Sequence, residues 1–263
     1  MNYYKITNQR EVHNYMRYKD GLNVDVLPFN PTGDCQSGGI YFASTDILAF
    51  LDYGPWIRKV IIPEGETIYE NPSTLDNPKK YKSHSVFLEP RRRVNAGVIK
   101  KLIEEGANIH AGNDNVLKWA SAYGHLDIVK FLVEKGADIH TRNDLPLCLA
   151  SESGHLNIVK FLVEKGADIH ASDDYSLKSA SFYGHLNVVK FLVEKQVDIH
   201  AEDDYAFRLA SKKGHLNIVR FLIEKGADIH AKDGYALKWA RTFNHLNVVK
   251  FLEKIYKIKN ELL

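Results

Sequence analysis

A period of thirty residues runs through the second part of the sequence and limits its fold more than any other feature. Two histidines return in each of five units, as His110, His140, His170, His200 and His230 in one series and as His125, His155, His185, His215 and His245 in the other. The full units start at residues 106, 136, 166, 196 and 226. Because a block this short cannot bury its own apolar face, the units must stack into a solenoid with one elongated core.

The third unit illustrates the local structure that the repeat predicts. Asp173 and Asp174 are expected to cap the N-terminus of a first helix over Tyr175–Tyr183. Gly184 is expected to end that helix in a left-handed conformation. A second helix is expected over Leu186–Lys195. Two helices joined by a tight turn therefore form the repeating block.

The repeat pattern also divides the chain. We expect a mostly α protein in which residues 1–93 form a small α+β domain and residues 94–263 form the helical solenoid. The half unit, 94–105, would cover the front of the stack. The helix of the last unit would continue to residue 263 and close the back.

The motifs "GADIHA" and "ASxxGHLxIVKFLVEKGAD" resemble those of the ankyrin-repeat family and cover about two thirds of the chain. The resemblance implies units of a turn, two antiparallel helices and a loop. Two features depart from the family pattern. The units are shorter than the usual length of about 33 residues, which predicts a short tip before the first helix. The "TPLH" motif is absent, and Pro146 alone retains its proline.

The shortened form, with its Asn, Lys, Ile and Tyr bias, is similar to ankyrin proteins of giant DNA viruses that infect amoebae. That resemblance implies a viral protein that acts in the host cytoplasm. It also implies a monomer with a protein partner from the host.

Histidines and aspartates are metal-site residue types, but here they recur at equivalent positions. Equivalent histidines would lie about 10 Å apart along a stack, whereas metal ligands converge on one ion. We therefore expect the ring nitrogens to bond backbone groups in the turns, and the aspartates to cap helices. No metal and no cofactor is expected. Gln196 replaces the glycine that opens the other units. If that position needs a positive φ, the change costs about 1 kcal/mol and weakens stacking locally.

The residues that differ between units are the better candidates for recognition. By resemblance to the family, the pair before each "GH" faces a concave groove that binds partners, and the residue at the previous turn lies beside it. Exposed aromatic side chains are typical anchors for a protein partner. The alternative is a variable surface without function. The candidate partner-binding residues are Trp119, Tyr123, Glu152, Phe182, Tyr183, Lys212, Lys213, Trp239 and Phe243.

Composition excludes several classes of function. A hydrophobic content of 44 % is normal for a globular protein, and a net charge of +2 is too small for a dedicated nucleic-acid binder. Cys35 and Cys148 are too far apart for a paired zinc motif, and they match no disulfide framework. The N-terminus lacks the apolar core of a signal peptide, and no run is long enough to span a membrane. We expect a soluble intracellular protein.

The first 93 residues do not repeat. "YYKIT", "GGIYFAS", "WIRKVIIP", "ETIYE" and "HSVFLE" are typical of strands, and "NQREVHNYM" and "STDILAFLDY" of helices. "NPSTLDNPKKYK" suggests an exposed loop. The basic run at Arg91–Arg93 could contact phosphate, but a solvated linker, or pairing with Glu104 and Glu105, is the preferred interpretation.

The order of these elements faintly resembles ADP-ribosyltransferase-like domains, which use a nicotinamide dinucleotide. The "EGE" at Glu64–Glu66 has the form of that family's paired-glutamate motif, which makes Glu66 the residue to test. The first strand lacks the arginine or histidine of the family, and a hairpin turn explains "EGE" equally well. The preferred interpretation is a noncatalytic binding protein, with the transferase-like enzyme as the alternative.

Overall fold

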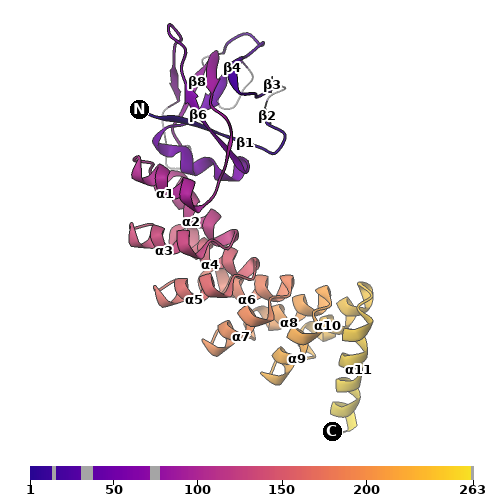
Figure 1. The fold of residues 1–263 in the computed structure, drawn as a ribbon. Helices are drawn as coiled ribbons and strands as arrows, with labels where there is room; N and C mark the ends of the chain where they lie inside the picture. The colour runs from indigo at the N-terminus through magenta and orange to yellow at the C-terminus, as the bar shows by residue number, and fades with distance from the viewer. Residues whose placement is uncertain (14–15, 31–37, 72–77, 262–263) are drawn as a thin grey trace. The chain divides into compact units, whose positions relative to one another are not determined.

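The computed structural model describes residues 1–13, 16–30, 38–71 and 78–261 (Figure 1). The chain forms two compact units. The first contains residues 1–120 and 127–138, and the second contains residues 121–126 and 139–263. The sequence division at residue 93 follows the repeat pattern and stays a prediction.

The first unit is built around an antiparallel sheet in the order β1-β6-β9-β4, with β10 also paired to β6. Smaller sheets of order β5-β8-β7 and β2-β3 accompany it. The bounds are β1 Tyr3–Thr7, β2 Val12–His13, β3 Met16–Arg17, β4 Gly21–Val24, β5 Ile40–Phe42, β6 Trp56–Ile61, β7 Tyr69–Asn71, β8 Lys80–Ser83, β9 Ser85–Leu88 and β10 Arg92–Arg93. A 3-10 helix, η1, covers Thr45–Tyr53. The hydrophobic core of the first unit includes Ile40, Phe42, Val60, Val86 and Leu88.

The same unit continues into the first repeat helices, α1 Ala96–Glu104, α2 Ala111–Ala122 (which ends just past the unit boundary) and α3 Leu126–Glu134. Asn95 caps α1, since its side chain accepts a bond from the Val98 N–H at 3.0 Å. Asn115 of α2 donates to Asp52 at 3.1 Å and to the Ala49 carbonyl at 3.2 Å, both in η1. Side-chain amides therefore join η1 to the helices that follow.

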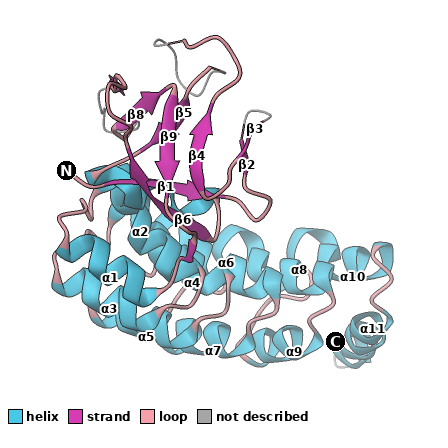
Figure 2. Cartoon of the chain, turned by 45° about the horizontal axis from the view of Figure 1, so that its top comes forward, coloured by secondary structure: helices cyan, strands magenta, loops and turns pink. Residues whose placement is uncertain are grey.

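The second unit consists of stacked helix pairs. Figure 2 shows α4, α6, α8 and α10 in one row and α5, α7 and α9 in another. The bounds are α4 Thr141–Glu152, α5 Leu156–Glu164, α6 Ala171–Tyr183, α7 Leu186–Glu194, α8 Ala201–Lys213, α9 Leu216–Glu224, α10 Ala231–Thr242 and α11 Leu246–Glu261. Leu177, Ala180, Val189 and Leu192 are buried between the rows. The expected helical solenoid is confirmed, and the predicted extension to residues 262 and 263 lies outside the described residues.

A left-handed turn opens the first helix of each thirty-residue repeat. Ser172, Asp173 and Asp174 have φ values of 55°, 56° and 58°, and regular helix follows from Tyr175. The Asp174 N–H donates to the His170 carbonyl at 3.2 Å. Left-handed backbone is costly for most residues and best tolerated by Gly, Asn and Asp. The recurring Asn-Asp and Asp-Asp pairs thus match a tip of three residues, as short as the thirty-residue period requires.

Several predictions for the first unit were wrong. In the described part of residues 8–16, a turn and β2 replace the predicted helix, because the Asn8 side chain bonds both backbone groups of Val12. The predicted loop over "KKYK" is strand β8, in which Lys80 and Lys82 are buried. Residues 72–77 of that loop lie outside the described residues. The predicted helix over residues 44–53 is present as a 3-10 helix, without a side-chain cap from Ser44.

Candidate partner-binding groove

From the second thirty-residue repeat on, the second histidine of each repeat bonds the turn of the repeat before it. Nε2 of His155, His185, His215 and His245 bonds the backbone carbonyls of Ala122, Glu152, Phe182 and Lys212, respectively, at 2.8–3.0 Å. The prediction that these rings bond backbone groups is confirmed. Each ring packs closely on the turn glycine of the previous repeat. A Cβ on Gly184, for example, would lie 2.7 Å from the ring of His215. In the described part of the chain, no group of His, Cys, Asp or Glu side chains is placed to hold a metal ion.

The first histidine series has a different partner from the one expected. Nδ1 of His110, His140, His170 and His200 bonds the carboxylate four residues later, at 2.8–3.1 Å, rather than a backbone group. In three repeats the same carboxylate oxygen accepts a hydrogen bond from a backbone N–H of the next repeat, as Asp144 does from the Asp168 N–H at 3.0 Å. The prediction that these aspartates cap their own helix was therefore wrong, because their side chains hold the following loop.

The fifth repeat, whose second helix is the longer helix α11, departs from the pattern of the other four repeats. Asn244 stands in place of the glycine at this turn and has φ 60°, and the chain continues as α11. Gly234 stands in place of the second aspartate, and a Cβ there would lie 2.8 Å from the Tyr256 hydroxyl. Tyr256 in α11 donates to the Ile229 carbonyl at 2.6 Å. The glycine at position 234 therefore leaves room for Tyr256 of α11 against the last loop.

The pair before each turn lies at the surface, as the family pattern implies. Tyr123, Tyr183 and Phe243 are 62 %, 50 % and 49 % exposed, and Lys213 is also exposed. Glu152, Phe182, Lys212 and Trp239 are half-buried. The residues one helical turn before these pairs are less accessible than their variation between repeats suggests, because Ser179 and Leu209 are buried. Trp119 is half-buried and belongs to the first unit.

Within the second unit, cations from one repeat lie against aromatic rings of its neighbours. Nζ of Lys213 is 4.3 Å from the centre of the Phe182 ring. Nζ of Lys212 is 5.2 Å from the centre of the Trp239 ring and 5.5 Å from that of Phe243. Cation–π contacts at exposed sites like these stabilise by about 0.5–1 kcal/mol each. We call these side chains the aromatic-cation cluster: Phe182, Tyr183, Lys212, Lys213, Trp239 and Phe243.

Two residues missed by the sequence reasoning extend this cluster. The Arg208 guanidinium lies 5.7 Å from the centre of the Trp239 ring, and the Tyr235 ring packs edge-on against Trp239 at 5.6 Å. Both lie on first helices. Variation at position 208, where the other repeats carry lysine or cysteine, was the available signal.

The opposite end of the groove is acidic. Tyr183 packs edge-on against Phe182, with centres 4.9 Å apart. The charge of Glu152, together with the hydrogen bond that its carboxylate accepts from the Tyr183 hydroxyl, raises the pKa of Tyr183 above its ordinary value. The candidate residues of the second unit thus extend from a carboxylate at Glu152 to two ammonium groups at Lys212 and Lys213.

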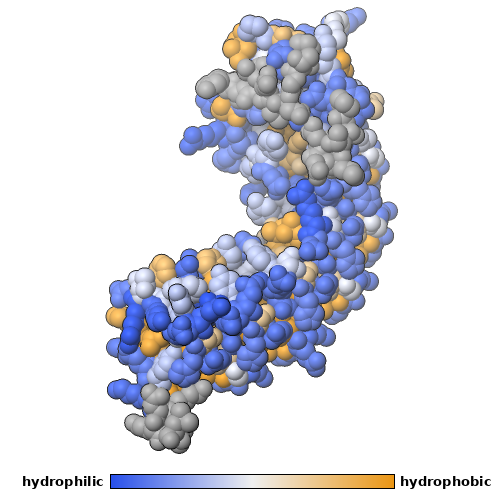
Figure 3. All heavy atoms as spheres, turned by 180° about the vertical axis from the view of Figure 1, so that it is seen from behind, coloured by the Kyte–Doolittle hydropathy of each residue, from blue (hydrophilic) through white to orange (hydrophobic). Residues whose placement is uncertain are grey.

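The surface has no broad apolar face on the side drawn in Figure 3, where hydrophobic residues form small patches among hydrophilic ones. Binding at such a surface depends on particular anchor residues rather than on total apolar area.

The candidate residues of the N-terminal region have structural partners. Glu66 lies at a turn, where its N–H donates to the Pro63 carbonyl at 3.2 Å. Its carboxylate accepts hydrogen bonds from Ser85 at 2.6 Å and Ser83 at 3.2 Å. Arg92 and Arg93 form strand β10 rather than a linker. Arg91 pairs with Glu11 at 3.3 Å, and the Glu105 carboxylate accepts a bond from Tyr4, so these two residues have partners other than those expected.

Comparison with known families agrees with this geometry. A family model described as ankyrin repeats in three copies matches residues 92–173 and 177–261, more than half of the chain. The protein therefore belongs to the ankyrin-repeat family.

Its relatives come from a giant virus. The putative ankyrin repeat protein R229 of Acanthamoeba polyphaga mimivirus is 36 % identical over 113 residues, which cover 41 % of this chain and 37 % of R229. The putative ankyrin repeat protein R868 of the same virus is 32 % identical over 134 residues, covering 48 % of this chain and 63 % of R868. The chain thus spans less than two thirds of either relative. The predicted resemblance to viral ankyrin proteins is confirmed.

Among the residues that the structure describes, no helix combines the length and apolar character needed to cross a membrane.

Proposed function

We propose that this protein is a noncatalytic binder that captures a host protein in the groove of its ankyrin stack. Ankyrin repeats generally serve protein–protein interaction, and the groove residues are the part of each unit that varies. The aromatic-cation cluster carries the proposal. Its rings and ammonium groups are held by neighbouring repeats, so little side-chain freedom is lost when a partner binds.

The cluster has the composition of a binding hot spot. Large aromatic side chains next to cations are enriched at the centres of protein interfaces. The half-buried Phe182 and Trp239 offer flat apolar area, and Lys212 and Lys213 offer charge beside it. The partner surface that fits this cluster is an acidic segment with at least one large apolar side chain.

Affinity capture from an amoebal lysate tests the proposal. The wild-type chain and the triple variant Tyr123→Ala, Phe182→Ala, Tyr183→Ala are each used as bait, and captured proteins are identified by mass spectrometry. The variant Phe87→Ala is the control, since Phe87 is an aromatic residue that is 43 % exposed on β9, outside the repeat helices.

We expect the triple variant to lose proteins that wild type and Phe87→Ala both retain. Circular dichroism must show that the triple variant is folded. If the folded triple variant captures the same proteins as wild type, the groove is not the binding surface.

The enzyme alternative makes a different prediction. A transferase-like N-terminal region would release nicotinamide from the dinucleotide, and Glu66→Gln would stop that release. We do not adopt this alternative, because the Glu66 carboxylate is occupied by two serine hydroxyls at a turn.

A further inference from the structure

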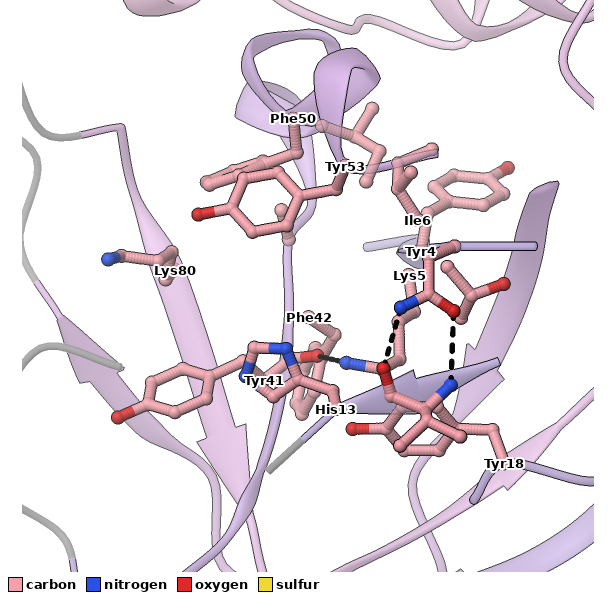
Figure 4. Close-up of a pocket in the computed structure, with 15 residues that line it drawn as sticks. Tyr4, Lys5, Ile6, His13, Tyr18, Tyr41, Phe42, Phe50, Tyr53 and Lys80 are labelled. Atoms are coloured by element: carbon pink, nitrogen blue, oxygen red, sulfur yellow. Dashed lines mark hydrogen bonds between the residues drawn. The ribbon is translucent and has the colours of Figure 1, made fainter. Parts of the chain in front are cut away.

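A pocket in the first unit is independent of the groove. It lies between η1, β1, β5 and the β2 strand, and its walls are largely aromatic (Figure 4). Tyr41 and Phe42 of β5 and Tyr18 are almost completely buried, so these walls are fixed by the core of the unit. Phe50 and Tyr53 of η1 lie on the opposite side of the opening in the close-up, and Tyr53 is 54 % exposed.

The floor of the pocket is polar and positively charged. Lys5 is only 6 % exposed, and its ammonium group donates to the Tyr41 carbonyl at 2.7 Å. The same ammonium group lies 4.4 Å from the centre of the Tyr18 ring. Figure 4 shows the His13 imidazole beside this group. The described lining of the pocket includes two lysines and this histidine and contains no carboxylate.

His13 supplies an unfilled hydrogen-bonding atom. Its Nε2 is buried and has no hydrogen-bond partner among the residues that the structure describes. Burying such an atom without a partner is unfavourable, so it is uncommon in a folded protein. An unfilled polar atom beside a pocket is explained when a ligand supplies the partner.

Perturbed titration behaviour gathers at the same place. Burial, followed by the charge of Lys5, lowers the pKa of His13. Burial raises the pKa of Tyr18, and burial together with a hydrogen bond to Glu105 raises the pKa of Tyr4 to about 12. Aromatic pockets that contain a few convergent polar groups with shifted pKa values are the usual form of small-molecule sites.

We propose that this pocket binds a small aromatic carboxylate, with the carboxylate on the floor and the ring between the aromatic walls. The ligand carboxylate would accept a hydrogen bond from Nε2–H of His13 and lie close to the ammonium group of Lys5. The space that water can enter measures about 80 Å³. That space holds several waters, at about 10–15 Å³ each, and suits one ring with a short substituent. The ring would contact Phe50 and Tyr53 at the mouth.

Titration calorimetry on the full chain tests the site with benzoate as the probe. Benzamide has nearly the same shape without the charge, and cyclohexanecarboxylate has the charge without the flat ring. We expect benzoate to bind about tenfold more tightly than benzamide, which is the effect of one charge-assisted hydrogen bond. We expect it to bind about threefold more tightly than cyclohexanecarboxylate, which keeps the charge but loses the contact between aromatic rings. N-acetyl-phenylalanine tests whether the end of a peptide can supply the same pair of groups.

Two variants locate the binding. His13→Phe removes the unfilled nitrogen and should leave thermal stability equal or higher while weakening benzoate binding by about tenfold. Tyr53→Ala shortens the wall at an exposed position and should weaken benzoate binding without unfolding the chain. Phe87→Ala is the control, because Phe87 is 43 % exposed on β9 and lies outside the pocket.

Equal binding of benzoate and benzamide would overturn the proposal, and so would the absence of benzoate binding to the wild-type chain. A Tyr53→Ala chain that binds as tightly as Phe87→Ala would do the same. If His13→Phe fails to fold, the histidine has a structural role and Tyr53→Ala alone decides the site.

Discussion

Replacing Gly184 with alanine tests whether the histidine of one unit holds the turn of the unit before it. Gly184 has φ 90°, and a Cβ there would lie 2.7 Å from Cε1 of His215. Nε2 of that histidine bonds the Phe182 carbonyl at 2.9 Å. The new methyl group must displace the ring and break this bond. Gly166 is the matched control, because it has φ 99° and nothing lies within 4 Å of a Cβ there.

The two variants share one cost and differ in another. Left-handed backbone costs an alanine about 1 kcal/mol relative to glycine at either position. Only Gly184→Ala also displaces His215 and leaves polar groups without partners, which adds about 1–3 kcal/mol. We expect Gly166→Ala to lose about 1 kcal/mol of unfolding free energy, and Gly184→Ala about 2–4 kcal/mol.

Urea unfolding followed by circular dichroism measures both losses. Native-state hydrogen exchange at the amides of α6 and α7 shows whether the loss is local, which matters because repeat proteins can unfold in parts. Equal losses for the two variants would refute the reasoning, since the contact with His215 would then contribute nothing.

Two further predictions concern other positions. Gln196 has φ 65°, so Gln196→Gly should stabilise the fourth unit by about 1 kcal/mol; hydrogen exchange should show lower protection near Gln196 in the wild type, and protection already uniform across the five units would count against this. Arg58 holds the pKa of the buried Glu11 below its ordinary value of 4.5, so the stability from this pair is present above that pH and is lost as the pH falls through the lowered value. Glu11→Gln should cost about 3 kcal/mol at neutral pH, and urea unfolding at acid pH should show this difference shrinking; a constant difference would contradict the assignment.

The repeat helices could be predicted because the period specifies them several times over. An error at one position is corrected by four equivalent positions, and the turn glycines and apolar spacing recur with the histidines. The tip was harder to predict. The recurring aspartates indicated a fixed local role, but a helix cap and a left-handed turn use the same residue type. Only the backbone angles separate these two roles.

The N-terminal region offered no such redundancy. Lys82 was placed in a loop by its charge, yet it is buried, because its ammonium group donates to the Asn30 carbonyl at 2.6 Å and lies 4.7 Å from the centre of the Tyr41 ring. Partners this distant in sequence are invisible to a local pattern. The aromatic-cation cluster was predicted residue by residue, but its contacts follow from stacking, which places Lys213 of the fourth unit on Phe182 of the third.

The hydrogen bonds from the second histidines also explain how the side chains of the variable pairs can differ between repeats without loss of the fold. Each histidine bonds the carbonyl of the first residue in the variable pair, and that acceptor belongs to the backbone. Alanine, glutamate, phenylalanine and lysine therefore present the same carbonyl at positions 122, 152, 182 and 212. The contact that fixes the turn places no demand on the side chain beside it. Stability and recognition are thus carried by different atoms of the same residue, and substitutions in the groove should change partner choice at little cost to stacking.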